Sequence, residues 1–337
     1  MAPMRLGYCL LTLVHIVVNV SVADTARAEA GGWRVALDID NDVVTGRDRH
    51  YTSGLLLTAL APADFLPSWI EGLGVVLPPF SKDAGEVRWA FGLGHGMYTP
   101  RISDESDLIA SDRPYAGYLY TRLGLYREHA AASVDGAPYL DTLEIDLGLV
   151  GPGAVGHEAQ DALHDIFPSP KFQGWDNQLE NEPALVVRGS RRWRLPGKSI
   201  EVTDHLSTDL IASVTAELGN VLTAGTAGLR LRLGKQLPED FGDGRFGNAT
   251  AKPEEFSLYV FVGADFSGVA HNIFLDGNTF RKSHDVNRRA YVVHAPAGLV
   301  FEKGRFRTEL SFVWNSKEFE GQTSPDVYGR WSIAYSY

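Results

Sequence analysis

The sequence predicts an all-β protein, an antiparallel transmembrane β-barrel of about twelve strands with a short helix in an extracellular loop. Three observations predict it. Apolar and polar residues alternate along many short segments, which is typical of strands with one apolar and one polar face. After residue 30, no run of about 18 apolar residues predicts a helical membrane span. The chain ends on Tyr337 within an alternating segment, which resembles the signal for outer-membrane insertion.

The alternation is clear near both ends of the chain. Trp33 and Leu37 fall on one face of the first segment and Asp38 on the other, and in the last segment Trp331 alternates with small residues. A soluble sandwich would turn the apolar face inward, whereas a barrel turns it to lipid. Expected export, a mature chain without cysteine and the terminal aromatic residue favour the barrel.

Twelve segments alternate in this way, an even number as expected of bacterial barrels. They span residues 33–41, 50–60, 86–98, 114–129, 139–150, 181–195, 199–217, 222–235, 256–272, 289–303, 305–315 and 326–337. If the first strand starts in the periplasm, the outer connections are 42–49, 99–113, 151–180, 218–221, 273–288 and 316–325. The inner ones are then 61–85, 130–138, 196–198, 236–255 and 304.

The first thirty residues are predicted to be a signal peptide. Arg5 precedes an apolar run over 7–20, and residues 28–30 (Ala-Glu-Ala) fit the small-x-small cleavage rule. Cleavage would leave 31–337 as one barrel domain and remove Cys9, the one cysteine, so no intrachain disulfide is expected. The formal net charge of −11 argues against a nucleic-acid partner, because binding phosphates needs a basic surface.

Polar motifs gather at the strand ends that are predicted to face outward. Residues 155–167 are the only good helical stretch, and its spacing places Gln160 and His164 on a polar side opposite apolar residues such as Ala162. The other motifs are Asn41-Asp42, Tyr51-Thr52-x-Gly54, Arg113-Pro114-Tyr115-Ala116-Gly117 and Gly174-Trp175-Asp176-Asn177-Gln178.

Together and in this order, these motifs resemble the outer-membrane lipid A 3′-O-deacylase family over essentially the whole mature chain. The resemblance implies a twelve-stranded barrel of the bacterial outer membrane that needs Ca²⁺ and removes an ester-linked acyloxyacyl group from lipid A at the extracellular side. Lipopolysaccharide and outer-membrane lipid are the partners it implies, and a monomer is expected. The essential residues that it implies are Asn41, Asp42, Thr52, Gln160 and His164.

Arg113 matches a basic residue that the resemblance connects with the phosphate or sugar of lipid A. Many members of the family carry a lysine beside this arginine, and this chain has Asp112 there. How the head group is held therefore differs from the family pattern.

The chemistry of ester hydrolysis agrees with these residues. The reaction needs an activated water and stabilisation of the oxyanion. We expect His164 to be the general base, because histidine exchanges protons near neutral pH, with Gln160 positioning the water or the ring. Asp42 is the expected Ca²⁺ ligand, since carboxylate oxygens suit this cation and the cation polarises the ester carbonyl. Asn41 would donate to the oxyanion, and Thr52 would orient the metal or the substrate.

Plainer explanations exist for the same residues. An Asn-Asp pair after a strand is ordinary turn chemistry, Arg113 could simply precede a strand, and Trp175 could belong to an interfacial girdle. His157 is expected to be a surface residue. Ser53 as a nucleophile is disfavoured because no Gly-x-Ser-x-Gly motif occurs. The alternative functions are a porin or adhesin barrel without enzymatic activity and an outer-membrane phospholipase.

Overall fold

The computed structural model describes residues 32–42, 50–63, 65–70, 87–102, 104–130, 136–166, 171–246 and 256–337. These residues form twelve antiparallel strands, each paired with the next, and β1 pairs with β12 to close the barrel. The strands are β1 (Arg34–Asn41), β2 (His50–Leu60), β3 (Val87–Thr99), β4 (Ala116–His129), β5 (Tyr139–Val150), β6 (Glu182–Thr203), β7 (Leu206–Gly219), β8 (Leu222–Lys235), β9 (Phe256–Asn272), β10 (Tyr291–Lys303), β11 (Phe306–Asn315) and β12 (Asp326–Ser336).

The two faces of the wall differ in chemistry, because successive residues of a strand point to opposite sides. The outer face exposes apolar side chains such as Leu147, Leu218, Val262, Phe266 and Leu310. The inner face carries buried charged side chains such as Arg34, Arg122, Glu144, Arg232 and Arg307. An apolar outside around a charged inside is typical of outer-membrane barrels and confirms the predicted fold class. Among the described helices, none has the length and hydropathy of a membrane span.

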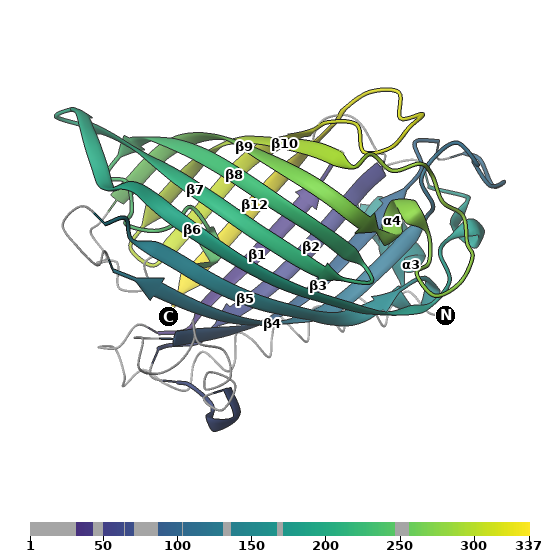
Figure 1. Cartoon of the computed structure of the whole chain (residues 1–337), viewed down its shortest axis with the longest axis horizontal. Helices are drawn as coiled ribbons and strands as arrows, with labels where there is room; N and C mark the ends of the chain where they lie inside the picture. Colours follow the sequence, from purple (N-terminus) through teal and green to yellow (C-terminus); the bar gives the residue numbers. More distant parts are fainter. Residues whose placement is uncertain are drawn as a thin grey trace.

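The predicted strands agree with the observed ones except at one hairpin. The connection expected at 196–198 is wrong, because β6 continues to Thr203 and the turn falls at 204–205. The pairing of β6 with β7 shifts between Leu195 and Ile200, so the Pro196-Gly197 pair lies in an irregular stretch of the strand, where proline is tolerated. The hairpin therefore extends beyond its neighbours (Figure 1).

The segment that follows β8 blocks the lumen. Residues 236–246, which end in the short helix η6 (Gly244–Phe246), reach the opposite wall, where η6 contacts β1, β2, β11 and β12. The Arg34 guanidinium donates two hydrogen bonds to the carbonyl of Gly244, at 2.9 and 3.1 Å. The carboxylates of Asp240 and Asp243 form ion pairs with arginines of the surrounding strands: Arg192, Arg232 and Arg307.

A second short helix narrows the lumen at the opposite end. The helix α4 (Ile273–Asp276) begins after Asn272, whose side chain accepts a hydrogen bond from the backbone N–H of Phe274. Phe274 is buried and stacks on Tyr98, with ring centroids 3.7 Å apart. This helix was not predicted, since 155–167 was expected to be the only helical stretch. Figure 1 shows α4 and α3 (Gly156–Ile166) at one end of the barrel and the C-terminus at the other.

Candidate active site on the outer wall of the barrel

The helix α3 packs on the outside of the wall. His95 belongs to an outward-facing row of paired residues that begins with an exposed tryptophan: Trp331, Ile39, Leu55, His95 and Leu119. The His95 Nε2 lies 2.8 Å from the carbonyl oxygen of Ala154, in the short helix η4 (Pro152–Ala154) just before α3. This hydrogen bond holds the start of the helix against the outer face.

Two glycines allow α3 to approach the wall closely. A Cβ on Gly117 of β4 would lie 3.0 Å from the backbone nitrogen of Gly156, which is the first residue of α3. The turn that enters the helix is strained, because the β-branched Val155 has φ 52° and ψ 36°. This left-handed conformation costs roughly 1–2 kcal/mol. Such strain persists where the surrounding structure enforces it, and it clusters at functional sites.

Asn41 lies on the same outer face. It pairs with Ser53, Ser53 pairs with Met97 and Met97 pairs with Gly117, so three strand spacings of about 4.8 Å separate Asn41 from Gly117. The helix η4 contacts β4 and β5, whereas α3 contacts β4 and β3. The chain therefore runs along the wall from β5 in the direction of β1, the strand that carries Asn41. The structure thus places Asn41 and α3 at the same end and on the same face.

The polar side of α3 is its buried side. Gln160 is 1% exposed and His164 is 9% exposed. Together with the buried Gly156 they are spaced four residues apart, so the three residues lie on one face of the helix. Ala162, on the predicted apolar side, is exposed. Burying an amide and an imidazole while exposing alanine is unfavourable for packing alone, because desolvated polar groups cost free energy. The helix thus packs against the wall through its polar side, with Gln160 and His164 buried.

An aromatic cluster supports these two side chains. The Trp175 Nε1–H donates a hydrogen bond to Gln160 Oε1 at 2.7 Å. Trp175 packs on Tyr115. The ring centroid of Phe172 lies 6.2 Å from that of Tyr115 and 6.3 Å from that of His164. Burial raises the pKa of Tyr115 to about 12, so the phenol stays neutral at neutral pH. Trp175 is only 2% exposed, which excludes the interfacial-girdle alternative.

Asp42 and Thr52 flank the same end of the wall. Asp42 follows β1 directly and is buried. The pairing of β2 with β3 shifts between Tyr51 and Ser53, so Thr52 occupies a β-bulge, a feature that redirects side chains and is over-represented beside active sites. The Thr52 side chain and residues 43–49 lie outside the described part of the chain.

Arg113 lies apart from these residues. It is 1% exposed, and its Nη2 donates to Glu318 Oε2 at 2.7 Å. Its guanidinium lies over the rings of Tyr98 and Phe319, and Tyr98 stacks on Phe274 of α4. Arg113 therefore lies at the lumen mouth, and a phosphate would compete with Glu318 for it.

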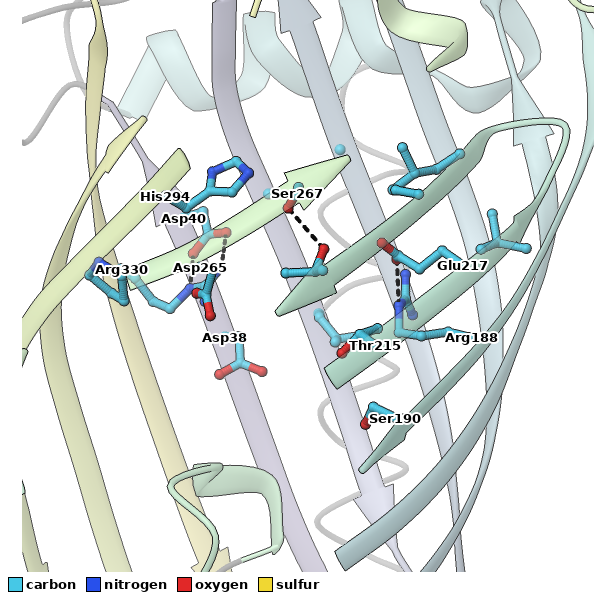
Figure 2. A pocket seen from close by; sticks show the side chains of 18 of the residues that line it. Asp38, Asp40, Arg188, Ser190, Thr215, Glu217, Asp265, Ser267, His294 and Arg330 are labelled. Carbon is cyan, nitrogen blue, oxygen red and sulfur yellow. Dashed lines mark hydrogen bonds and ion pairs between the residues drawn. The ribbon is translucent and has the colours of Figure 1, made fainter. Parts of the chain in front are cut away.

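A cavity of about 690 Å³ lies inside the barrel. Figure 2 shows its walls, where Asp40 pairs with Arg330 and Arg188 with Glu217. The described residues that line it include Arg113 but none of the other predicted site residues. Gln160, His164 and Asn41 therefore lie outside this cavity, although His95 borders it, and the cavity charges shown are compensated by internal ion pairs.

Two supporting residues were missed at the level of sequence. His95 interrupts an outward apolar row between Leu93 and Met97, and a polar side chain in a lipid-facing row is a recognisable functional signal. Trp175 belongs to the motif at residues 174–178, but its contact with Gln160 depends on how the loop folds back. Such a contact produces no periodic pattern in the sequence.

Comparison with known proteins identifies the family. Residues 9–337 match the family described as outer membrane protein LpxR. The chain belongs to this family. The solved structure of LpxR from Salmonella typhimurium is 21% identical, covers 90% of this chain and 99% of its own, and superposes with a TM-score of 0.68, a likeness in fold. The β domain of the Bordetella autotransporter BrkA is 11% identical, with coverage of 92% and 100% and a TM-score of 0.48. Comparison with curated proteins gave no match.

Membership of the LpxR family places this chain in the outer membrane. The described residues contain no cluster of three or more histidine, cysteine or acidic side chains around a possible metal position. Ca²⁺ also accepts amide, backbone carbonyl and water oxygens, so a calcium site does not require such a cluster. The buried Asp42 and its sequence neighbour Asn41 carry the hard oxygen donors that Ca²⁺ prefers.

Proposed function

We propose that this LpxR-family protein is a Ca²⁺-dependent carboxylic ester hydrolase that removes the 3′-linked acyloxyacyl group from lipid A of lipopolysaccharide. The observation that carries the proposal is the burial of Gln160 and His164 against the outer wall of a membrane barrel. A hydrolytic group at this place meets the sugars and acyl chains of a lipid leaflet, not solutes of the lumen. The motifs that resemble the deacylase family supply the substrate class.

His164 carries the proton transfers in this proposal. Its imidazole removes a proton from a water molecule, and the resulting hydroxide attacks the ester carbonyl carbon. When the tetrahedral intermediate collapses, the bond between that carbon and the 3′ oxygen breaks. The imidazolium then returns the proton to the leaving oxygen. The products are the free acyloxyacyl acid and lipid A with a 3′ hydroxyl group.

The residues at the end of β1 and in β2 complete the site. Asp42 and the amide oxygen of Asn41 would hold Ca²⁺ together with backbone or water oxygens, or Asn41 would instead donate its amide N–H to the oxyanion. Bound Ca²⁺ supplies polarisation of the ester carbonyl. Thr52 orients the substrate or the metal ligands. Arg113 would contact a phosphate or sugar of lipid A through its other N–H donors, since Glu318 engages its Nη2.

The sidedness follows from loop lengths. Outer-membrane barrels have short turns on the periplasmic side and longer loops outside. At one end of the barrel, the connection between β5 and β6 contains α3 and the connection between β9 and β10 contains α4. We therefore assign the α3 end to the extracellular side, where the outer leaflet holds lipopolysaccharide.

Substrate choice tests this function against the phospholipase alternative. Purified protein supplied with lipid A and with phosphatidylethanolamine in the same mixed micelles is expected to shorten lipid A only, because the proposed site recognises the disaccharide ester. Mass spectrometry of both lipids checks the result. Release of lysophospholipid at a higher rate than loss of the acyloxyacyl group would reject the assignment in favour of a phospholipase.

The blocked lumen bears on the porin alternative. Because residues 236–246 reach the far wall and Phe274 narrows the other end, we expect no steady ion conductance when the protein is inserted into a planar bilayer. A twelve-stranded porin inserted under the same conditions is the control. Discrete, long-lived openings of this chain would support a channel function.

A further inference from the structure

The hydrogen bond between Trp175 and Gln160 determines which way the glutamine amide points. The oxygen and nitrogen of an amide are hard to distinguish by shape, but an indole N–H is only a donor. The Gln160 atom 2.7 Å from Trp175 Nε1 must therefore be the oxygen, Oε1. The amide nitrogen, Nε2, consequently points away from the indole.

That nitrogen is a buried donor in need of an acceptor. Gln160 Nε2 is inaccessible to solvent and has no hydrogen-bond partner among the described residues. A buried polar group without a partner is rare and calls for an explanation, because its desolvation is not compensated. Gln160 also precedes His164 by four residues on the buried face of α3, where side chains at this spacing are neighbours.

We propose that Trp175 is a positioning residue that holds the Gln160 amide in the orientation that presents its N–H donors to the bound ester. The inference rests on the proposed function and deepens it, because it assigns a direction to Gln160. With Oε1 engaged by the indole, the amide donates to the ester carbonyl oxygen, on which negative charge develops during attack. In this role the amide nitrogen acts as a hydrogen-bond donor to the substrate.

The cluster around Trp175 suits this role. Its ring is buried against Tyr115 and beside the closely packed Gly156, so the indole has little freedom to turn. A Cβ on Gly156 would lie 2.9 Å from the Trp175 ring atom Cη2. The rigid indole therefore transmits its orientation to the glutamine.

A double-mutant cycle tests the inference on lipid A as substrate. Trp175→Phe keeps the packing and removes the N–H, and we expect kcat to fall about 10-fold, the equivalent of one net hydrogen bond, with KM unchanged. In a Gln160→Ala background the same substitution is expected to cost nothing further, because its only route to the reaction has been removed. An equal loss of kcat in both backgrounds would overturn the inference and leave the proposed function standing.

Trp331→Phe is the matched control. It also deletes an indole hydrogen bond, to Thr308 Oγ1 at 2.9 Å, but on the outer wall of β12. We expect its kcat to equal that of the unmodified protein. All variants are first compared for the heat-dependent shift in electrophoretic mobility that folded barrels display.

Gln160→Glu separates a donor from an acceptor. The carboxylate still accepts from Trp175 but offers no N–H, so we expect activity as low as that of Gln160→Ala. Near-normal kcat for Gln160→Glu would contradict the inference, because an acceptor would then suffice.

A spectroscopic measurement tests the contact without activity. The Trp175 indole ¹H–¹⁵N resonance, assigned by its loss in Trp175→Phe, is expected to be protected from solvent exchange and to lose protection in Gln160→Leu. An unchanged exchange rate would overturn the inference whatever the activity. Protection with no hydrolysis of lipid A by the unmodified protein would reject both the proposed function and the catalytic role of this amide.

Discussion

Replacing His164 by alanine is expected to abolish lipid A deacylation, with kcat lower by about 10²–10⁴-fold, because the reaction loses the group that removes a proton from water. The side chain is buried on the wall-facing side of α3, so no other described histidine of that helix can replace it. Mass spectrometry of lipid A from cells that express each variant measures the loss of the acyloxyacyl group.

His157→Ala is the matched control for this substitution. His157 lies on the same helix, but its side chain is 48% exposed and stacks on Trp175. We expect deacylation in this variant to remain within a factor of two or so of normal, as for most surface substitutions. Equal product from His164→Ala and the unmodified protein would remove His164 from the mechanism.

Removing Ca²⁺ is expected to have an effect of similar size. Chelation with EGTA should lower hydrolysis of lipid A at least about 10³-fold, because polarisation of the carbonyl by a metal contributes several kcal/mol to the transition state. Adding back Ca²⁺ should restore the rate, whereas Mg²⁺ should not, since it prefers a tighter octahedral shell and keeps its water.

Asp42→Asn connects the metal to a residue. The substitution removes one negative charge and preserves the shape of the side chain, so we expect a higher Ca²⁺ concentration for half-maximal activity with the barrel still folded. Asp161→Asn, on the half-exposed side of α3, serves as the control. A full rate in EGTA, or an unchanged Ca²⁺ requirement in Asp42→Asn, would contradict the role assigned to the metal.

Most strands were predictable because apolar and polar residues alternate along them. The lipid-facing residues must be apolar and the lumen residues need not be, so the alternation appears directly in the sequence. The position of the β6–β7 turn was not predicted, because proline and glycine usually end a strand. Here Pro196 and Gly197 form an irregularity within β6. Helix α4 was not predicted, because four residues are too few to establish a helical period.

The candidate site was predictable as a set of residues but not as an arrangement. The register places Asn41 and the start of α3 on one outer face, and the convergence of His164 with Asn41 and Asp42 stays a prediction. The face that α3 buries was not readable, because the usual rule buries the apolar side and this helix buries Gln160 and His164. Arg113 was assigned by motif alone, and its partner Glu318 lies 205 residues away.

In the proposed function, the attachment of α3 to the outside of the wall determines how the substrate reaches the site. A molecule that is confined to a leaflet arrives there by lateral diffusion in two dimensions, so its surface density, rather than its bulk concentration, governs the rate of encounter. Dilution with inert lipid should then slow turnover even when the total amounts of protein and substrate stay constant. Solution kinetics in which only volume concentrations vary would miss this dependence.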